Sequence, residues 1–190
     1  MGAPRGKDRG RPEVRGLKMT EKGDQRGGPL LNIADVELTE QKHGEGFEAR
    51  LGSISGPLGA RLLGCRVTVV PPGKRAWPFH SHHANEEMFI ILEGEGTLRY
   101  GDGVYPIRRG DVVICPPGGP ETAHQIVNSS SADLTYLCVS TMNAPDIMEY
   151  PDSGKFGAFA GVAPGGDKSR RTFTIFGRKS DAVDYWDGEG

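Results

Sequence analysis

The sequence predicts an all-β fold, either an antiparallel sandwich or a closed barrel, and three observations lead to this class. Glycine and proline together make up 43 of the 190 residues (29 plus 14), a turn-rich share that disfavours a helical bundle. Short apolar runs rich in β-branched residues recur along the chain, separated by turns that contain Gly or Pro. No long helical pattern lies between these runs, so alternating strands and helices are not expected.

The strand pattern is clearest at residues 65–70, where Cys65, Val67 and Val69 occupy alternate positions and a Pro-Pro-Gly turn follows. The lead-in before it, residues 29–64, is punctuated by glycine turns and hints at a strand only at 35–38. The later strands are expected at residues 88–92, 97–100, 104–107, 111–115, 125–128, 134–141 and 172–176, with 97–100 and 104–107 forming a hairpin.

The chain has the length of a single domain, which we divide into three parts. Residues 1–28 carry eight Lys and Arg against four Asp and Glu and are expected to be a disordered basic tail. A start at Met19 is an alternative that would make residues 1–18 upstream sequence. The barrel domain is expected at residues 29–170, around a core of motifs at 62–141. Residues 171–190 are expected to be an extension that packs on the barrel or on a partner subunit.

Composition disfavours several classes of function. No run of about 18 apolar residues and no signal-peptide core is apparent, so we expect a cytoplasmic protein without a membrane partner. The basic tail contains no aromatic residue that could stack on a base, so no nucleic-acid partner is expected. Cys65, Cys115 and Cys138 form no CxxC pair, and we expect three buried free thiols.

Histidine is concentrated in one part of the chain. His80 and His82 would share one face of a strand, and Glu87 could add a carboxylate from the neighbouring strand. His124 would supply the fourth ligand. Three imidazoles and one carboxylate suit Mn, Fe, Ni, Zn or Cu, so the ligands predict one divalent transition metal without naming it.

These residues lie in two spaced motifs. The stretch His80-x-His82-x4-Glu87-x6-Gly94 resembles the first motif of the cupin superfamily, and Gly110-x5-Pro116-x-Gly118-x5-His124-x3-Asn128 resembles the second. Two loop insertions distinguish this chain, one between Gly73 and His80 and one at residues 119–121. The wider stretch is similar to small single-domain bacterial cupins of uncharacterised activity. The resemblance implies a double-stranded β-helix, or jelly-roll, barrel with irregular terminal extensions, a divalent metal in its mouth and commonly a dimer.

The remaining residues near the motifs are expected to shape the pocket. Phe89 and Ile91 share strand parity with Glu87, and Ile126 shares it with His124, so an apolar lumen is predicted. Asn128 is expected to bond backbone groups. Four polar residues are candidates for orienting a ligand: Arg66, Arg75, Arg99 and Tyr136. The alternative for each is a surface salt bridge or, for Tyr136, a hydroxyl that is hydrogen-bonded within the protein. His83 and Glu86 are expected to lie outside the set of metal ligands.

Two functions remain open from the sequence. The first is a metalloenzyme that acts on a small oxygen-rich molecule, of oxygenase or isomerase type, with no catalytic residue assigned beyond the metal ligands. The alternative is a small-ligand-binding or sensor protein without turnover. A homodimer is predicted because many aromatic residues follow the motifs: Phe156, Phe159, Phe173, Phe176, Tyr185 and Trp186.

Overall fold

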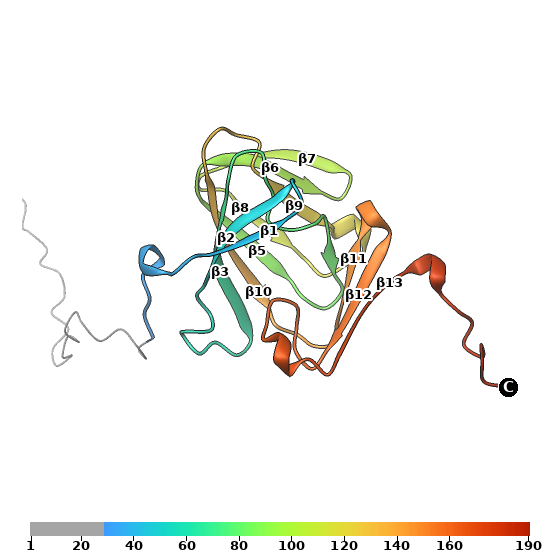
Figure 1. The fold of residues 1–190 in the computed structure, drawn as a ribbon. Coiled ribbons are helices and arrows are strands. Elements are labelled where there is room, and N and C mark those ends of the chain that lie inside the picture. Colours follow the sequence, from blue (N-terminus) through green and yellow to red (C-terminus); the bar gives the residue numbers. More distant parts are fainter. Residues whose placement is uncertain (1–28) are drawn as a thin grey trace, which may run out of the picture.

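The computed structural model describes residues 29–190, so the tail predicted at residues 1–28 lies outside the described part of the chain. Its strands form three antiparallel sheets, in the orders β1-β2-β3-β10-β5-β8, β13-β12-β11-β4 and β7-β6-β9 (Figure 1). The strands are β1 (Thr39–His43), β2 (Phe47–Ser53), β3 (Leu63–Val70), β4 (Ser81–His82), β5 (Glu87–Glu93), β6 (Glu95–Tyr100), β7 (Gly103–Arg108), β8 (Val112–Cys115), β9 (His124–Val127), β10 (Leu134–Thr141), β11 (Asp146–Tyr150), β12 (Lys155–Ala160) and β13 (Phe173–Arg178).

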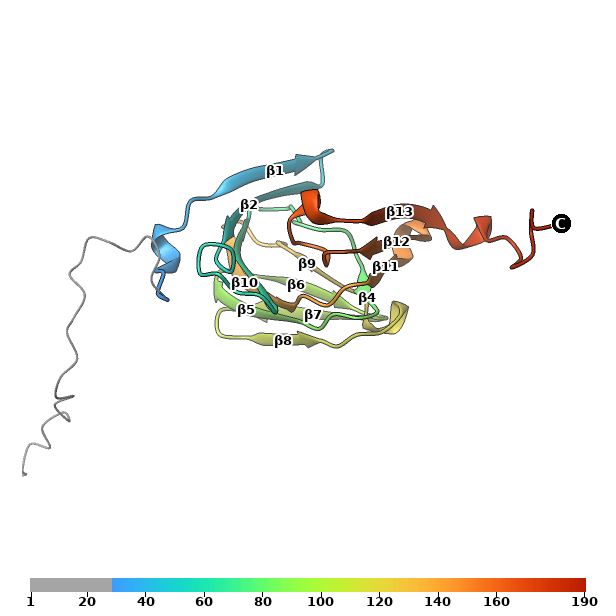
Figure 2. The same cartoon turned by 90° about the horizontal axis from the view of Figure 1, so that it is seen from below.

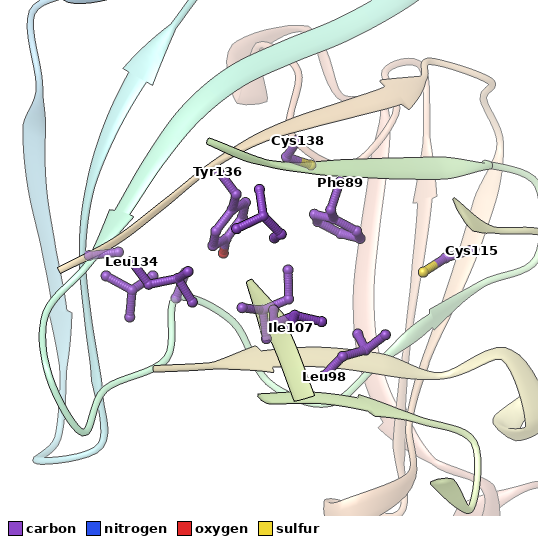
Figure 3. Close-up of a cluster of buried hydrophobic side chains, with 12 residues drawn as sticks. Phe89, Leu98, Ile107, Cys115, Leu134, Tyr136 and Cys138 are labelled. Carbon is purple, nitrogen blue, oxygen red and sulfur yellow. The ribbon is translucent and has the colours of Figure 1, made fainter. Parts of the chain in front are cut away.

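Strand β10 organises the largest sheet, because it pairs with β3 on one side and β5 on the other. Alternate residues of β10 are buried, and Leu134, Tyr136 and Cys138 point into the core. Figure 3 shows Tyr136 and Phe89 facing Leu98 and Ile107 across this core. The full cluster comprises Ala49, Val70, Ala76, Phe89, Ile91, Leu98, Ile107, Cys115, Ile126, Leu134, Tyr136 and Cys138.

The second layer closes the barrel opposite this sheet. Strands β12 and β13 lie on the other side of the molecule from β5 and β8 in both views (Figures 1 and 2). A smaller cluster of Met148, Tyr150 and Phe159 packs between β11 and β12. The all-β jelly-roll fold predicted from the sequence is therefore confirmed.

Most of the predicted strands are present, including the hairpin of β6 and β7. The strand suggested at 35–38 was wrong: residues Ile33–Asp35 form a 3-10 helix because the Asn32 side chain accepts a hydrogen bond from the Ala34 N–H. Within the lead-in, β1 and β2 pair as a hairpin that extends the large sheet, whereas residues 54–62 form turns. The C-terminal extension likewise contributes β13, which pairs with β12 along six residues.

The three cysteines are free thiols, as expected, with Cys115 and Cys138 buried and Cys65 partly buried. None of the helices in residues 29–190 is long and apolar enough to cross a membrane.

Candidate metal centre

The ends of three strands, β4, β5 and β9, bring the predicted ligands together. His80 lies just before β4, and its backbone pairs with that of His124 at the start of β9 through two N–H···O hydrogen bonds of 3.2 and 2.8 Å. His82 is the second residue of β4, and Glu87 is the first residue of β5. All four side chains are buried, so the barrel withdraws three imidazoles and a carboxylate from water.

The three imidazoles point their Nε2 atoms toward one carboxylate oxygen, Glu87 Oε2. The distances from that oxygen are 2.8 Å to His124, 3.6 Å to His82 and 3.8 Å to His80. His80, Glu87 and His124 each offer one ligand atom within 4.8 Å of the others. The structure therefore brings together every residue that the sequence predicted as a ligand. His80, Glu87 and His124 form the tightest group, and His82 lies next to them.

The opposite nitrogen of each ring is held by an oxygen acceptor. His80 Nδ1 lies 2.7 Å from the carbonyl oxygen of Pro78, and His124 Nδ1 lies 3.2 Å from that of Thr122. His82 Nδ1 lies 2.7 Å from Asp146 Oδ2. A proton held on Nδ1 leaves the Nε2 lone pair available, which is the arrangement that metal-binding histidines usually have.

The electrostatics of the cluster keep Glu87 ionised and His80 neutral. Burial, helped by the neighbouring His124, lowers the pKa of His80 to about 3. Burial alone would raise the pKa of Glu87, but the hydrogen bond from His124 and the nearby His82 hold it well below its usual range. At neutral pH the cluster thus combines a carboxylate with an unprotonated imidazole, the forms that ligate metals.

The donor chemistry fits a divalent transition metal. The Nε2 atoms of His80 and His82 are too far from Glu87 Oε2 for a hydrogen bond, and neither has another hydrogen-bond partner within residues 29–190. His124 Nε2 lies 2.8 Å from Glu87 Oε2, and a cation held between the imidazoles and this carboxylate would take the place of a shared proton. Three nitrogens and one carboxylate oxygen are ligands that Mn, Fe, Ni and Zn all accept.

Two residues support the cluster although sequence reasoning did not find them. Asp146 is buried, and besides holding His82 it accepts hydrogen bonds from the Ala84 N–H and from the Asn85 side chain. The Cys138 thiol donates to Glu87 Oε1 at 3.5 Å, on the side of the carboxylate away from His124. Asp146 is 64 residues from His82, so no local spacing could have revealed it.

The other residues singled out in the sequence take varied positions. Phe89 packs its ring 5.4 Å from that of His124, and Ile91 and Ile126 are buried in the core, so the prediction of an apolar lumen is confirmed. The Asn128 amide bonds the carbonyl oxygens of Val70 and Ala132, as expected of a residue that ties down backbone.

The polar candidates divide between the core and the surface. Tyr136 is buried against Phe89 and Arg99 pairs with Asp152. Arg75 lies over the ring of Phe47. His83 is exposed and its Nε2 lies 2.8 Å from Oε1 of the buried Glu149 on β11, and Glu86 is exposed. Arg66 lines a cavity near the start of β3.

Comparison with known proteins gives a consistent result. Residues 66–140 match the family model described as a cupin domain. An uncharacterised protein of Methanocaldococcus jannaschii is 33% identical over 72 residues, which cover 38% of this chain and 54% of that protein. An oxalate-binding protein of Thermotoga maritima is 34% identical over 70 residues, which cover 37% of this chain and 54% of that protein. The match thus spans about half the length of these curated relatives.

The fold also resembles solved structures over most of its length. A crystal structure described as a putative sugar phosphate isomerase from Acidithiobacillus ferrooxidans superposes with a TM-score of 0.68 at 26% identity. The superposition covers 82% of this chain and 95% of that one. The two motifs, the barrel and the domain match agree, and residues 66–140 of this chain form a cupin domain.

Proposed function

We propose that the chain binds one divalent transition metal, either Fe, Mn, Zn or Ni, through His80, His82, Glu87 and His124. We further propose that it is a metalloenzyme of oxygenase or isomerase type acting on a small oxygen-rich molecule. The observation that carries this proposal is the convergence of three Nε2 atoms on one oxygen of Glu87, while each Nδ1 is held by another acceptor.

The residues around the cluster would define the reaction environment. A bound divalent metal would supply Lewis-acid polarisation of a ligand oxygen, or redox chemistry if it is iron. Phe89 and Ile126 make the adjoining wall apolar and so exclude water. Asp146, the other carboxylate in contact with the ligands, is fully engaged by hydrogen bonds and positions His82. A chemistry that needs no additional carboxylate base is therefore favoured.

The names of two similar proteins support a small, oxygen-rich ligand. One relative is described as oxalate-binding, and one similar structure is described as a putative sugar phosphate isomerase. Oxalate and sugar phosphates are both negatively charged, and both carry oxygen atoms that could bind a metal.

Metal analysis tests the site directly. Purified protein should carry about one transition-metal ion per chain, and His82→Ala combined with His124→Ala should abolish binding. His43→Ala is a matched control, because His43 is an exposed histidine at the end of β1. Far-UV circular dichroism establishes that each variant is folded. Stoichiometric metal in the folded double variant would contradict the proposed ligand set.

The alternative function is a small-ligand-binding or sensor protein that does not turn its ligand over. The similarity to an oxalate-binding protein favours it. A substrate screen of the metal-loaded protein, with oxygen uptake and product analysis as readouts, separates the two functions. Turnover supports the enzyme, whereas saturable binding without product supports the binding protein.

A further inference from the structure

A cavity of about 990 Å³ lies at the end of the large sheet where β3 begins and β10 ends. Its walls come from the lead-in, from the loop at residues 54–61 and from the segment at residues 161–170. The four predicted metal ligands do not line it. The cavity is therefore distinct from the candidate metal centre.

Arg66 is a cavity-lining residue on β3, the strand next to β10. It lies on the same face of β3 as Thr68 and Val70, which are buried in the barrel. Its partner across β10 is Cys138, whose thiol contacts Glu87. Two strand spacings, roughly 10 Å, therefore separate the backbone of Arg66 from that of β5.

The guanidinium of Arg66 is held in place but is not neutralised. It lies 5.5 Å from the centre of the Trp77 ring, and Nη2 donates to the carbonyl oxygen of Gly165 at 3.3 Å. A Cβ at Gly165 would lie 2.7 Å from Nη2, so this close approach depends on glycine. No carboxylate of residues 29–190 lies within 4.0 Å of the guanidinium, and most of its five N–H donors have no acceptor.

The other charged residues that line the cavity are exposed, and they include both cations and carboxylates. Arg61 and Arg170 lie at exposed positions of the wall. Asp167 is occupied in capping the short helix at residues 168–170, and Asp35 and Glu37 lie on the exposed lead-in. Arg66 is thus the partly buried cation with free donors, and a guanidinium fork suits the paired oxygens of a carboxylate or phosphate.

We propose that this cavity binds the oxyanion end of a small molecule, a carboxylate or a phosphate, and that Arg66 is its anchor. One part of this proposal rests on the proposed function: that the molecule bound here is also the ligand of the proposed metal site. The anion site itself requires no metal, so it can be examined in chelator-treated protein.

Calorimetric titration with inorganic phosphate and with oxalate tests the proposal, using chelator-treated and metal-loaded protein. Arg66→Gln should weaken binding of at least one of the two anions by roughly 10- to 100-fold, the effect of losing hydrogen bonds to a charged group. Arg66→Lys should weaken it less, because it keeps the charge but loses the planar fork. Arg108→Gln, at an exposed position of β7, should bind like the wild type. Whichever anion depends on Arg66 identifies the oxyanion.

Protection from chemical modification tests the same site in the unmodified sequence. Phosphate or oxalate should slow the reaction of Arg66 with phenylglyoxal, followed by peptide mass spectrometry, and should leave Arg108 unaffected. Equal anion affinity in wild type and Arg66→Gln, or no binding by the wild type, would overturn the proposal. A lower melting temperature without a change in affinity would show a purely structural role and would also overturn it. Anion binding that depends on Arg66 in a protein that takes up no metal would support the anion site while refuting the proposed metal function.

Discussion

At the scale of single residues, Asp146 holds the ring of His82 from the side away from Glu87. Burial would raise the pKa of Asp146, but the hydrogen bonds from His82 and Asn85 lower it, so the group stays an ionised acceptor. A carboxylate in this position fixes both the tautomer and the direction of the imidazole. Asp146 is therefore part of the candidate metal centre without being one of the proposed ligands.

Replacing Asp146 by Asn should weaken metal binding by about 10- to 100-fold, the usual effect of removing a hydrogen-bond partner of a ligand. The amide keeps the shape of the side chain but removes the charge that orients His82. Competition with a chromophoric chelator measures the affinity. Asp152→Asn is the control, because Asp152 pairs with Arg99 at the surface. An Asp146→Asn protein that binds metal as tightly as the Asp152→Asn protein would contradict this role.

Acid should destabilise the metal-free protein over a defined pH window. Burial lowers the pKa of His80 from 6.5 to about 3, so below pH 6.5 the unfolded chain takes up a proton that the native chain does not. The free energy of unfolding should therefore fall as the pH falls between these values, by up to about 1.4 kcal/mol for each pH unit. The pKa of Glu87, which burial would raise but the histidines lower, adds a loss in the same direction below its ordinary value of 4.5.

Urea unfolding of chelator-treated protein across this pH range measures the slope. His80→Gln should flatten it, because the variant removes the buried group that resists protonation. His43→Gln should keep the wild-type slope, since His43 is exposed. Identical slopes in wild type and His80→Gln would show that His80 does not set the acid sensitivity.

At the scale of elements, two tight turns of the motif region depend on glycine for different reasons. Gly94, between β5 and β6, and Gly110, before β8, both have positive φ angles, of 82° and 93°. A Cβ at Gly94 would lie 2.4 Å from the carbonyl oxygen of Asp133, whereas a Cβ at Gly110 would meet no atom within 4 Å. Gly94 therefore combines backbone strain with a steric requirement, and Gly110 has the strain alone.

Gly110→Ala should destabilise the protein by about 1–3 kcal/mol, the cost of holding a residue with a side chain in this conformation. Gly94→Ala should cost more, because the backbone of residue 133 must also move. Urea unfolding of the two variants provides the comparison, and each serves as the control of the other. Equal losses would contradict the steric argument for Gly94.

The elements also show which parts of the fold were readable from the sequence. Strand β10 was predictable because its buried residues alternate with less buried ones, and β3 because it is a run of β-branched residues that ends at a Pro-Pro-Gly turn, although its last four residues are all buried. Strand β1 was missed because its five residues are polar and none is buried, so its sequence shows no alternation of apolar and polar residues. Strand β11 was missed because buried Asp146 and Glu149 interrupt its apolar residues.

The candidate site likewise has residues that were predictable from the sequence and residues that were not. The convergence of the four proposed ligands was predictable because three of them fall within eight residues and the fourth completes a second motif. Asp146 and Cys138 come from strands that only the sheet pairing brings next to β4 and β5. Their roles depend on contacts across the barrel, which a single sequence does not display.

At the scale of the whole molecule, the C-terminal part leaves apolar surface uncovered. Strand β13 is an edge strand, and Phe173, Ile175 and Phe176 on it are 53%, 45% and 56% exposed. The chain then extends away from the barrel (Figures 1 and 2), and Tyr185 and Trp186 are 83% and 72% exposed. An unpaired edge flanked by apolar side chains is a surface on which another chain can pair.

A homodimer that pairs through β13 therefore remains our prediction, because a two-fold axis would cover the free edge and these aromatic residues in both copies at once. Light scattering should give about twice the chain mass of 20.4 kDa. Ile175→Lys should shift the protein to monomer, because a charge on the edge strand would have to be buried in the dimer. Val104→Lys, which changes a residue that is 69% exposed on β7, should leave the dimer intact. A wild-type protein that stays monomeric at high micromolar concentration would refute the dimer, and a dimer unaffected by Ile175→Lys would place its interface elsewhere.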